Sequence, residues 1–148
     1  MAELHFAQLH ADEFAEAIFA LRQAALPADD IDAERMTFFR LADDAGALGW
    51  AALEQYGPDA LLRSVLTVPD RRSSGVGTEL VRRVSASAAD QGVERLWLLT
   101  ETAAPFFAKL GFIESGRENA PASMRGTTEF RGVCPASATC MTMTLVAA

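Results

Sequence analysis

Hydrophobic and polar positions alternate over the first residues of the chain and then change to a helical spacing. The alternation from Glu3 to Leu9 predicts a strand. A helix follows, which begins at Asp12 and Glu13 and is ended by Pro27. The apolar face of this helix is predicted to consist of Phe14, Ile18, Leu21 and Ala25.

Three consecutive strands are predicted over residues 36–68. The turn-forming sequences Asp-Asp-Ala-Gly and Gly-Pro-Asp interrupt the apolar pattern twice, and short turns of this kind join antiparallel neighbours. The last of the three strands, 60–68, is apolar except at Arg63 and Ser64. Such a strand is typical of the centre of a sheet.

The second half of the chain alternates helical and strand patterns. Residues 78–90 have apolar positions at helical spacing, with Gly92 beyond them as a C-cap. Residues 95–99 form a buried strand pattern. Because a crossover helix joins parallel neighbours in a sheet, we expect 60–68 and 95–99 to pair in parallel. The inward side chains of the helix are predicted to be Leu80, Val84 and Ala88.

The remaining segments complete a mixed sheet. Thr102 is predicted to cap a short helix that has Pro105 in its first turn. A strand at 112–115, a helix from Pro121 and a closing strand at 138–146 follow. The closing strand is expected to form an edge of the sheet that a second copy of the chain can pair with, as in a homodimer.

Length and composition are consistent with one domain of this kind. Half of the 148 residues are hydrophobic, which suffices for one sizeable core. We therefore expect a single domain over residues 1–148. Its fold class is α/β, with an antiparallel N-terminal meander and a central parallel strand pair.

Charge and cysteine content narrow the classes of partner. The chain has 13 Lys and Arg against 20 Asp and Glu, a formal net charge of −7. An acidic surface repels phosphate backbones and anionic lipids, so we expect neither nucleic acid nor membrane as a partner. The first residues lack a signal-peptide pattern, and two cysteines are too few for a secreted disulfide framework. A cytoplasmic protein without a metal site is expected.

Residues 68–84, VPDRRSSGVGTELVRRV, combine two glycines with several arginines. Small residues let backbone N–H groups approach an oxygen, and a helix N-terminus adds about half a positive charge. The stretch lacks the Lys-Ser/Thr of a Walker loop and the third small residue of a dinucleotide-binding fingerprint. Two interpretations stay open, a loop that binds an anionic ligand and a helix start that needs two flexible residues.

Two motifs resemble those of the GNAT acyltransferase superfamily. Arg72-Ser-Ser-Gly75-Val-Gly77 resembles the family's Q/R-x-x-G-x-G/A motif. Residues 100–112, TETAAPFFAKLGF, resemble its N-x-x-A-x-x-F-Y-x-K-L-G-F block. This resemblance implies the GNAT fold, acetyl-CoA as the donor substrate, and two central strands that splay apart to admit the thioester.

The same resemblance assigns residues to donor binding. Backbone N–H groups of Ser73 to Gly77 would hold the pyrophosphate, and Thr67 and Val68 would pair their backbone with the pantetheine arm. Phe106 and Phe107 would either line the pantetheine channel or fill the core. The full set of implied donor-binding residues is Thr67, Val68, Arg72, Ser73, Ser74, Gly75, Val76, Gly77, Thr78, Thr100, Phe106, Phe107 and Lys109.

The chain departs from the family pattern at three positions, one of which is Ser73 in place of the commonest glycine of the loop. Thr100 replaces the asparagine of the second block, and Phe107 replaces a tyrosine that in many members protonates the leaving thiolate. Phenylalanine cannot donate a proton, so Thr100 or Thr102 becomes a candidate donor. The main hypothesis is an N-acetyltransferase for a small amine. The alternatives are a non-catalytic acyl-CoA-binding or sensing module and an O-acyl or longer-chain acyltransferase.

The chain also resembles a narrower group within this family. Segments between Leu48 and Leu145, among them 53–68, 117–130 and 134–141, resemble the arsenic-resistance N-acetyltransferases. That resemblance implies an arsenic-containing or phosphinic amino acid as one acceptor, which acetylation of the amine would detoxify.

Three charged residues are candidates for handling the acceptor. Glu54, at the end of a strand beside Arg63 and Ser64, is the first candidate for the general base. Its alternative role is that of an ordinary cross-strand partner of arginine. Arg63 either pairs with a carboxylate or binds an acidic group of the acceptor bidentately, and Arg125 offers a second guanidinium for that purpose.

Overall fold

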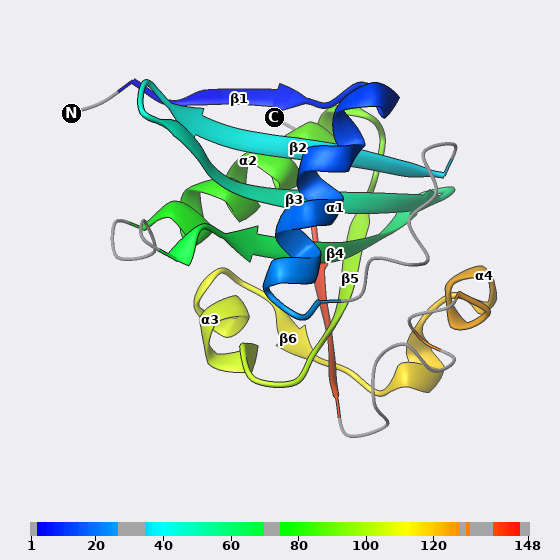
Figure 1. Ribbon diagram of the computed structural model, residues 1–148. Coiled ribbons are helices and arrows are strands. Elements are labelled where there is room, and N and C mark those ends of the chain that lie inside the picture. Colours follow the sequence, from blue (N-terminus) through cyan, green and yellow to red (C-terminus); the bar gives the residue numbers. More distant parts are fainter. Residues whose placement is uncertain (1–2, 27–34, 70–74, 128–129, 131–137, 146–148) are drawn as a thin grey trace. The chain divides into compact units, whose positions relative to one another are not determined.

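The computed structural model describes residues 3–26, 35–69, 75–127, 130 and 138–145. Figure 1 shows the elements in order. Those before the central helix are β1 (His5–Gln8), the 3-10 helix η1 (Ala11–Glu13), α1 (Phe14–Gln23), β2 (Met36–Asp43), β3 (Gly46–Tyr56) and β4 (Asp59–Thr67). The rest are α2 (Val76–Asp90), β5 (Arg95–Thr100), α3 (Ala104–Lys109), β6 (Ile113–Glu114), the 3-10 helix η3 (Arg117–Asn119), α4 (Ala122–Arg125) and β7 (Thr139–Thr144).

The strands form a seven-stranded mixed sheet in the order β1-β2-β3-β4-β5-β7-β6. Pairing is antiparallel for β1 with β2, β2 with β3, β5 with β7 and β6 with β7, and parallel for β4 with β5. The predicted mixed α/β fold and its parallel strand pair are therefore confirmed.

The chain divides into two compact units. The first comprises Met1–Glu54 and Arg63–Val84, and the second comprises Gln55–Leu62 and Ser85–Ala148. A single domain over 1–148 stays a prediction, and each unit is described by itself below.

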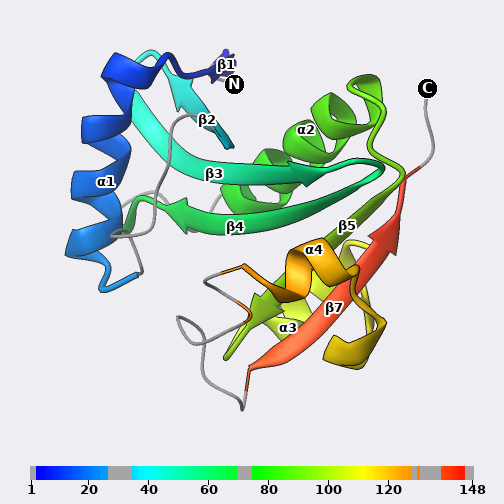
Figure 2. The same ribbon diagram turned by 90° about the vertical axis from the view of Figure 1, so that its right-hand side faces the viewer.

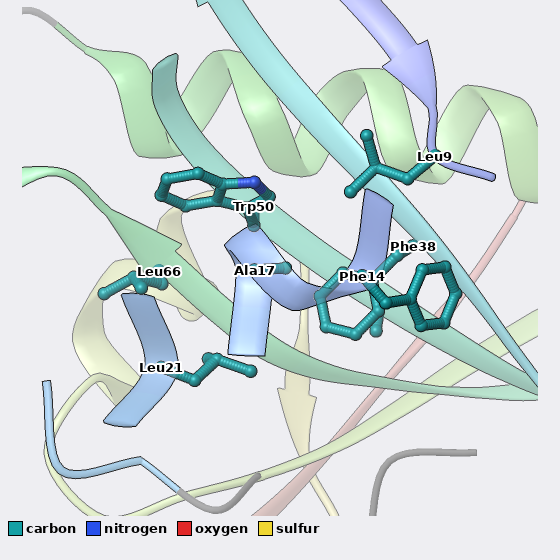
Figure 3. Packing of buried hydrophobic residues seen from close by; sticks show 8 residues of the cluster. Leu9, Phe14, Ala17, Leu21, Phe38, Trp50 and Leu66 are labelled. Atoms are coloured by element: carbon teal, nitrogen blue, oxygen red, sulfur yellow. The ribbon is translucent and has the colours of Figure 1, made fainter. Parts of the chain in front are cut away.

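The core of the first unit lies between α1 and one face of β2 and β3 (Figure 3). Helix α1 crosses these strands, and Phe14 packs edge-on against Phe38 with ring centroids 5.1 Å apart. Trp50 and Ala52 of β3 lie in the same cluster. Because alternate residues of a strand face opposite sides, these two residues lie on the same face of β3. The buried members of the cluster are Leu9, Phe14, Ala17, Leu21, Phe38, Trp50, Ala52 and Leu66.

The opposite face of β3 contacts α2, as Figure 2 shows. A Cβ atom added at Gly49 would lie 2.6 Å from the carbonyl oxygen of Leu66 and 3.3 Å from a methyl carbon of Leu80 in α2. The backbone of Val68 donates to the carbonyl of Leu48 at 2.8 Å. Gly49 thus lets the end of β4 lie close against β3 beneath α2.

The second unit is built on β5 and β7, which pair from Arg95↔Thr144 to Thr100↔Thr139. Met124 of α4 and Ala120 pack with Trp97 in its core. The indole N–H of Trp97 donates to a carboxylate oxygen of Asp59 at 2.9 Å, so a side-chain hydrogen bond joins β5 to the first residue of β4. The buried members of this core are Leu61, Trp97, Ala120, Met124 and Cys140.

The predicted end of the first helix is wrong. Helix α1 ends at Gln23, and Ala25 is exposed with φ +58°. The N–H of Leu26 donates to the carbonyl of Leu21, and that of Ala25 to the carbonyl of Arg22. This is a Schellman motif, which ends the helix before Pro27 is reached. Ala17, not Ala25, completes the buried face.

Two further predictions need correction. Thr102 does not cap α3, because the N-cap is Ala103 and no side chain caps it. Instead, the hydroxyl oxygen of Thr100 accepts a hydrogen bond from the N–H of Ala103 at 3.1 Å. The closing strand β7 is not an edge, because it lies between β5 and β6 and pairs with Ile113 and Glu114 of β6. Pairing of two copies through β7 therefore loses its structural basis.

The helices at 78–90 and from Pro121 are confirmed as α2 and α4, and α2 begins two residues earlier, at Val76. The side chains of Leu80, Val84 and Ala88 are fully buried, as predicted. Among the described helices, none has both the length and the apolar character to cross a lipid bilayer.

We predict that Gly49→Ala lowers the free energy of unfolding by about 1–3 kcal/mol, because the added methyl group must displace backbone and not a flexible side chain. Urea denaturation followed by circular dichroism measures this change. Gly126→Ala is the matched control, since Gly126 has φ −83° and a Cβ there would meet its nearest atom at 3.7 Å. Equal losses in the two variants would contradict the close approach at Gly49.

Candidate functional site

A buried ion pair lies in the first unit, between β3 and β4. A terminal nitrogen of Arg63, Nη1, donates to Oε1 of Glu54 at 2.9 Å. The two side chains are 1% and 7% exposed, respectively. A charge removed from water is costly unless it is paired and hydrogen-bonded. Arg63 and Glu54 each provide the other with an opposite charge and a hydrogen-bond partner. The sequence-based expectation that Glu54 lies beside Arg63 is confirmed.

The backbone of β4 is irregular where this pair forms. Ser64 has φ +57°, a left-handed conformation that costs a non-glycine residue about 1–2 kcal/mol. Its hydroxyl oxygen accepts a long hydrogen bond, 3.4 Å, from Nε of Arg63. Two atoms of the Arg63 guanidinium are therefore fixed, one by Ser64 and one by Glu54.

Glu54 belongs to the face of β3 that α1 covers. Trp50, Ala52 and Glu54 occupy alternate positions of the strand, and Trp50 and Ala52 pack with α1. Met36 of β2 is the register partner of Glu54. The carboxylate thus lies at the end of an otherwise apolar row.

The glycine-rich stretch opens α2 as its motif predicts. Gly75 is exposed with φ +73°, and its carbonyl accepts the N–H of Glu79 at 3.1 Å. The amides of Val76, Gly77 and Thr78 occupy the first helical turn, where N–H groups have no intrahelical acceptor. This start is suited to an anion. Arg72, Ser73 and Ser74 lie outside the described residues.

Part of the positive charge expected near this loop is already paired. Arg63 binds Glu54, and Nε of Arg83 donates to Glu79 one helical turn away at 2.6 Å. Arg82 is exposed. Two of the arginines in and near this stretch therefore already have carboxylate partners.

The end of β4 contains two of the predicted donor-binding residues. In the described register β4 pairs with β5 from Asp59↔Arg95 to Leu61↔Trp97, while β4 itself continues to Thr67. Val68, the next residue, is held by its bond to Leu48.

In the second unit, Thr100 and the aromatic residues of α3 take definite places. The hydroxyl oxygen of Thr100 accepts from Ala103, so its proton is left to donate. Phe107 is 7% exposed and packs edge-on against Phe106 and Phe112, with centroids 5.0 and 5.5 Å apart. Phe107 is therefore largely buried among aromatic side chains. Lys109 lies exposed in the last turn of α3.

Arg125 and Cys140 also lie in the second unit. Arg125 is exposed at the end of α4. Burial raises the pKa of the Cys140 thiol, an effect that the charge of Arg117 partly offsets. The thiol is therefore neutral near pH 7 and a poor nucleophile or metal ligand. No group of three or more metal-ligating side chains occurs among the described residues, and Cys134 lies outside them.

Sequence reasoning missed two backbone features of this site. Gly49 stands within the apolar pattern of β3, and a glycine inside a strand is a signal of close backbone approach. The left-handed conformation of Ser64 has a weaker signal in the sequence than the close approach at Gly49. That signal is a small polar residue beside a lone arginine in an otherwise apolar strand.

Comparison with solved structures identifies the fold. The N-acetylglutamate synthase of Neisseria gonorrhoeae, complexed with coenzyme A and L-arginine, superposes with a TM-score of 0.79 at 20% identity, over 98% of this chain and 34% of that one. Rv2747 of Mycobacterium tuberculosis, in complex with CoA and NLQ, gives a TM-score of 0.79 at 18% identity over 96% of this chain and 99% of that one.

Sequence comparison adds shorter matches. The amino-acid acetyltransferases of Ectopseudomonas mendocina and Azotobacter vinelandii are 42% identical over 55 residues, which is 37% of this chain but 13% of theirs. The acetyltransferase (GNAT) domain profile matches residues 34–114, more than half of the chain, including β2 to β6 and the glycine-rich start of α2. This chain belongs to the GNAT acetyltransferase family.

Proposed function

We propose that this chain is an acetyl-CoA-dependent N-acetyltransferase that acts on the amine of a small molecule. The observation that carries the proposal is the start of α2, the helix that follows β4 in the sequence, with Gly75 left-handed and exposed immediately before it. A helix start of this kind suits a phosphate group, and membership in the GNAT family indicates that the phosphate is part of acetyl-CoA.

Donor binding is proposed to use the backbone. The amides of 73–77, with Thr78 nearby, hold the pyrophosphate, and the backbone of Thr67 and Val68 pairs with the pantetheine arm. The start of α2 supports the first contact, because the amides of Val76, Gly77 and Thr78 lie in its first turn and Gly75, immediately before them, is exposed. Arg72, Thr100, Phe106, Phe107 and Lys109 stay proposed donor contacts on the family resemblance alone.

The reaction joins the acceptor nitrogen to the acetyl carbon. The amine attacks the thioester carbonyl, a C–N bond forms, and the C–S bond breaks to release CoA as a thiolate. Glu54 is proposed to accept the proton that the amine loses. A thiol with a pKa of about 8.5 leaves tolerably as its anion. The Thr100 hydroxyl is proposed to pass it a proton while taking one from water.

The acceptor is proposed to resemble an amino acid. The curated relatives are called amino-acid acetyltransferases, and a net charge of −7 favours a metabolite over nucleic acid. Arg125, which is exposed, is proposed to bind an acidic group of such an acceptor. An arsenic-containing or phosphinic amino acid is the narrower form of this proposal and belongs in the acceptor panel.

We predict CoA release when the protein is incubated with acetyl-CoA and a panel of amines that includes amino acids and their arsenic and phosphinic analogues. Glu54→Gln should lower kcat by about 100- to 10,000-fold without raising the KM for acetyl-CoA, because the amide cannot accept the proton. Free thiol is followed with a chromogenic disulfide. Glu114→Gln, an exposed glutamate of β6, is the matched control.

Two outcomes would redirect the proposal. Binding of CoA without thiol release from any amine would favour a non-catalytic acyl-CoA-binding module. Full activity in Glu54→Gln would remove Glu54 as the base.

We predict that Gly75→Ala weakens CoA binding by about 5- to 30-fold, since a left-handed alanine costs about 1–2 kcal/mol and the loop must adopt that conformation to present its amides. Titration calorimetry measures the change. Gly57→Ala is the matched control, because Gly57 has φ +64° and, like Gly75, no atom within 4 Å of an added Cβ. Equal weakening in both variants would show that strain alone, and not the site, is responsible.

A further inference from the structure

We infer that Arg63 positions the carboxylate of Glu54 for proton transfer and does not bind the acceptor. The inference rests on the proposed N-acetyltransferase function, in which Glu54 is the base. The sequence left both roles open for Arg63, because a lone arginine in an apolar strand requires an anionic partner but does not reveal which one.

The contacts of Arg63 point inward. Its Nη1 lies 2.9 Å from Oε1 of Glu54, and its Nε lies 3.4 Å from the hydroxyl oxygen of Ser64. The side chain of Arg63 is 1% exposed. Because so little of this side chain is exposed, an acceptor would reach the guanidinium only if Arg63 moved outward, and the buried carboxylate would then lose its cation.

Ser64 provides a second contact that holds the Arg63 guanidinium in place. Its φ of +57° interrupts the regular conformation of β4 immediately after Arg63. Its hydroxyl then bonds the guanidinium of the preceding residue. A second contact on a different nitrogen restricts rotation of the guanidinium plane, and through it the orientation of the Glu54 carboxylate.

The planar geometry of arginine is what this role requires. A guanidinium presents its donors in a fixed fork, whereas the ammonium group of lysine is a point charge on a flexible stem. Lysine at position 63 can therefore neutralise Glu54 without holding it in one orientation. By contrast, Arg125 is exposed and keeps its side chain available to solvent and acceptor.

The test is a double-variant cycle of wild type, Arg63→Lys, Glu54→Gln and the combined variant, with acetyl-CoA and an acceptor that the wild type uses. Arg63→Lys should lower kcat by ~10- to 100-fold, the effect of a misplaced catalytic group. The KM for the amine should stay within about threefold of wild type, because acceptor binding is not lost. In the Glu54→Gln background the same change should alter kcat by less than about threefold, because the group that Arg63 positions is already absent.

Two controls separate positioning from folding and from charge. Arg95→Lys, at an exposed position of β5, shows the effect of an arginine-to-lysine change away from this site. Should Arg63→Lys fail to fold by circular dichroism, Ser64→Gly replaces it in the same cycle. That variant suits the left-handed backbone and removes only the contact to Nε, so a smaller loss of kcat is expected that again disappears with Glu54→Gln.

Each outcome decides the matter. Losses of kcat that multiply in the combined variant would overturn the inference, because Arg63 would then act independently of Glu54. A tenfold or larger rise in the KM of carboxylate-bearing amines alone would show that Arg63 binds the acceptor. An inactive wild type would instead overturn the proposed function, and this inference with it.

Discussion

The buried ion pair of Arg63 and Glu54 is the constraint on which the account of this protein depends. Removing two charges from water costs several kcal/mol per ion, and an apolar pair of similar volume would serve stability equally well. Once one charge is present, however, the other is required, because an unpaired buried charge costs about 3–5 kcal/mol. The pair therefore has a physical rationale if its carboxylate is used, and proton transfer from an amine is a use that the GNAT chemistry provides.

Strand β4 makes the contacts that hold Arg63 in place beside Glu54. Its start is joined to β5 by parallel pairing and by the bond from Trp97 to Asp59. Its middle carries Arg63 and the left-handed Ser64. Its end lies against Gly49 of β3, and the next helix along the chain, α2, begins at Val76, immediately after the left-handed Gly75. A strand fixed at these points can hold the arginine that pairs with Glu54.

Much of this arrangement was predictable from local sequence. The apolar spacing of 78–90 and the turns before Ala47 and Ala60 are local signals, and α2 and the β2 to β4 meander follow them. The paired positions of Glu54 and Arg63 follow from the same meander.

The ends of elements were harder to predict. The Schellman motif at Ala25 and the hydrogen bond between the N–H of Ala103 and the hydroxyl of Thr100 depend on backbone conformation and not on residue type. The place of β7 between β5 and β6 depends on pairing between distant segments, which no local pattern encodes. Likewise, the conformation of Ser64 is enforced by its surroundings.

A crystal structure of the protein with CoA and an acceptor amine tests the central claim most directly. The account predicts that Nη1 of Arg63 stays within hydrogen-bond distance of Glu54, that the Glu54 carboxylate faces the acceptor nitrogen, and that the CoA pyrophosphate is bound by amides at the start of α2. An Arg63 side chain turned away from Glu54 and bound to the acceptor would contradict it.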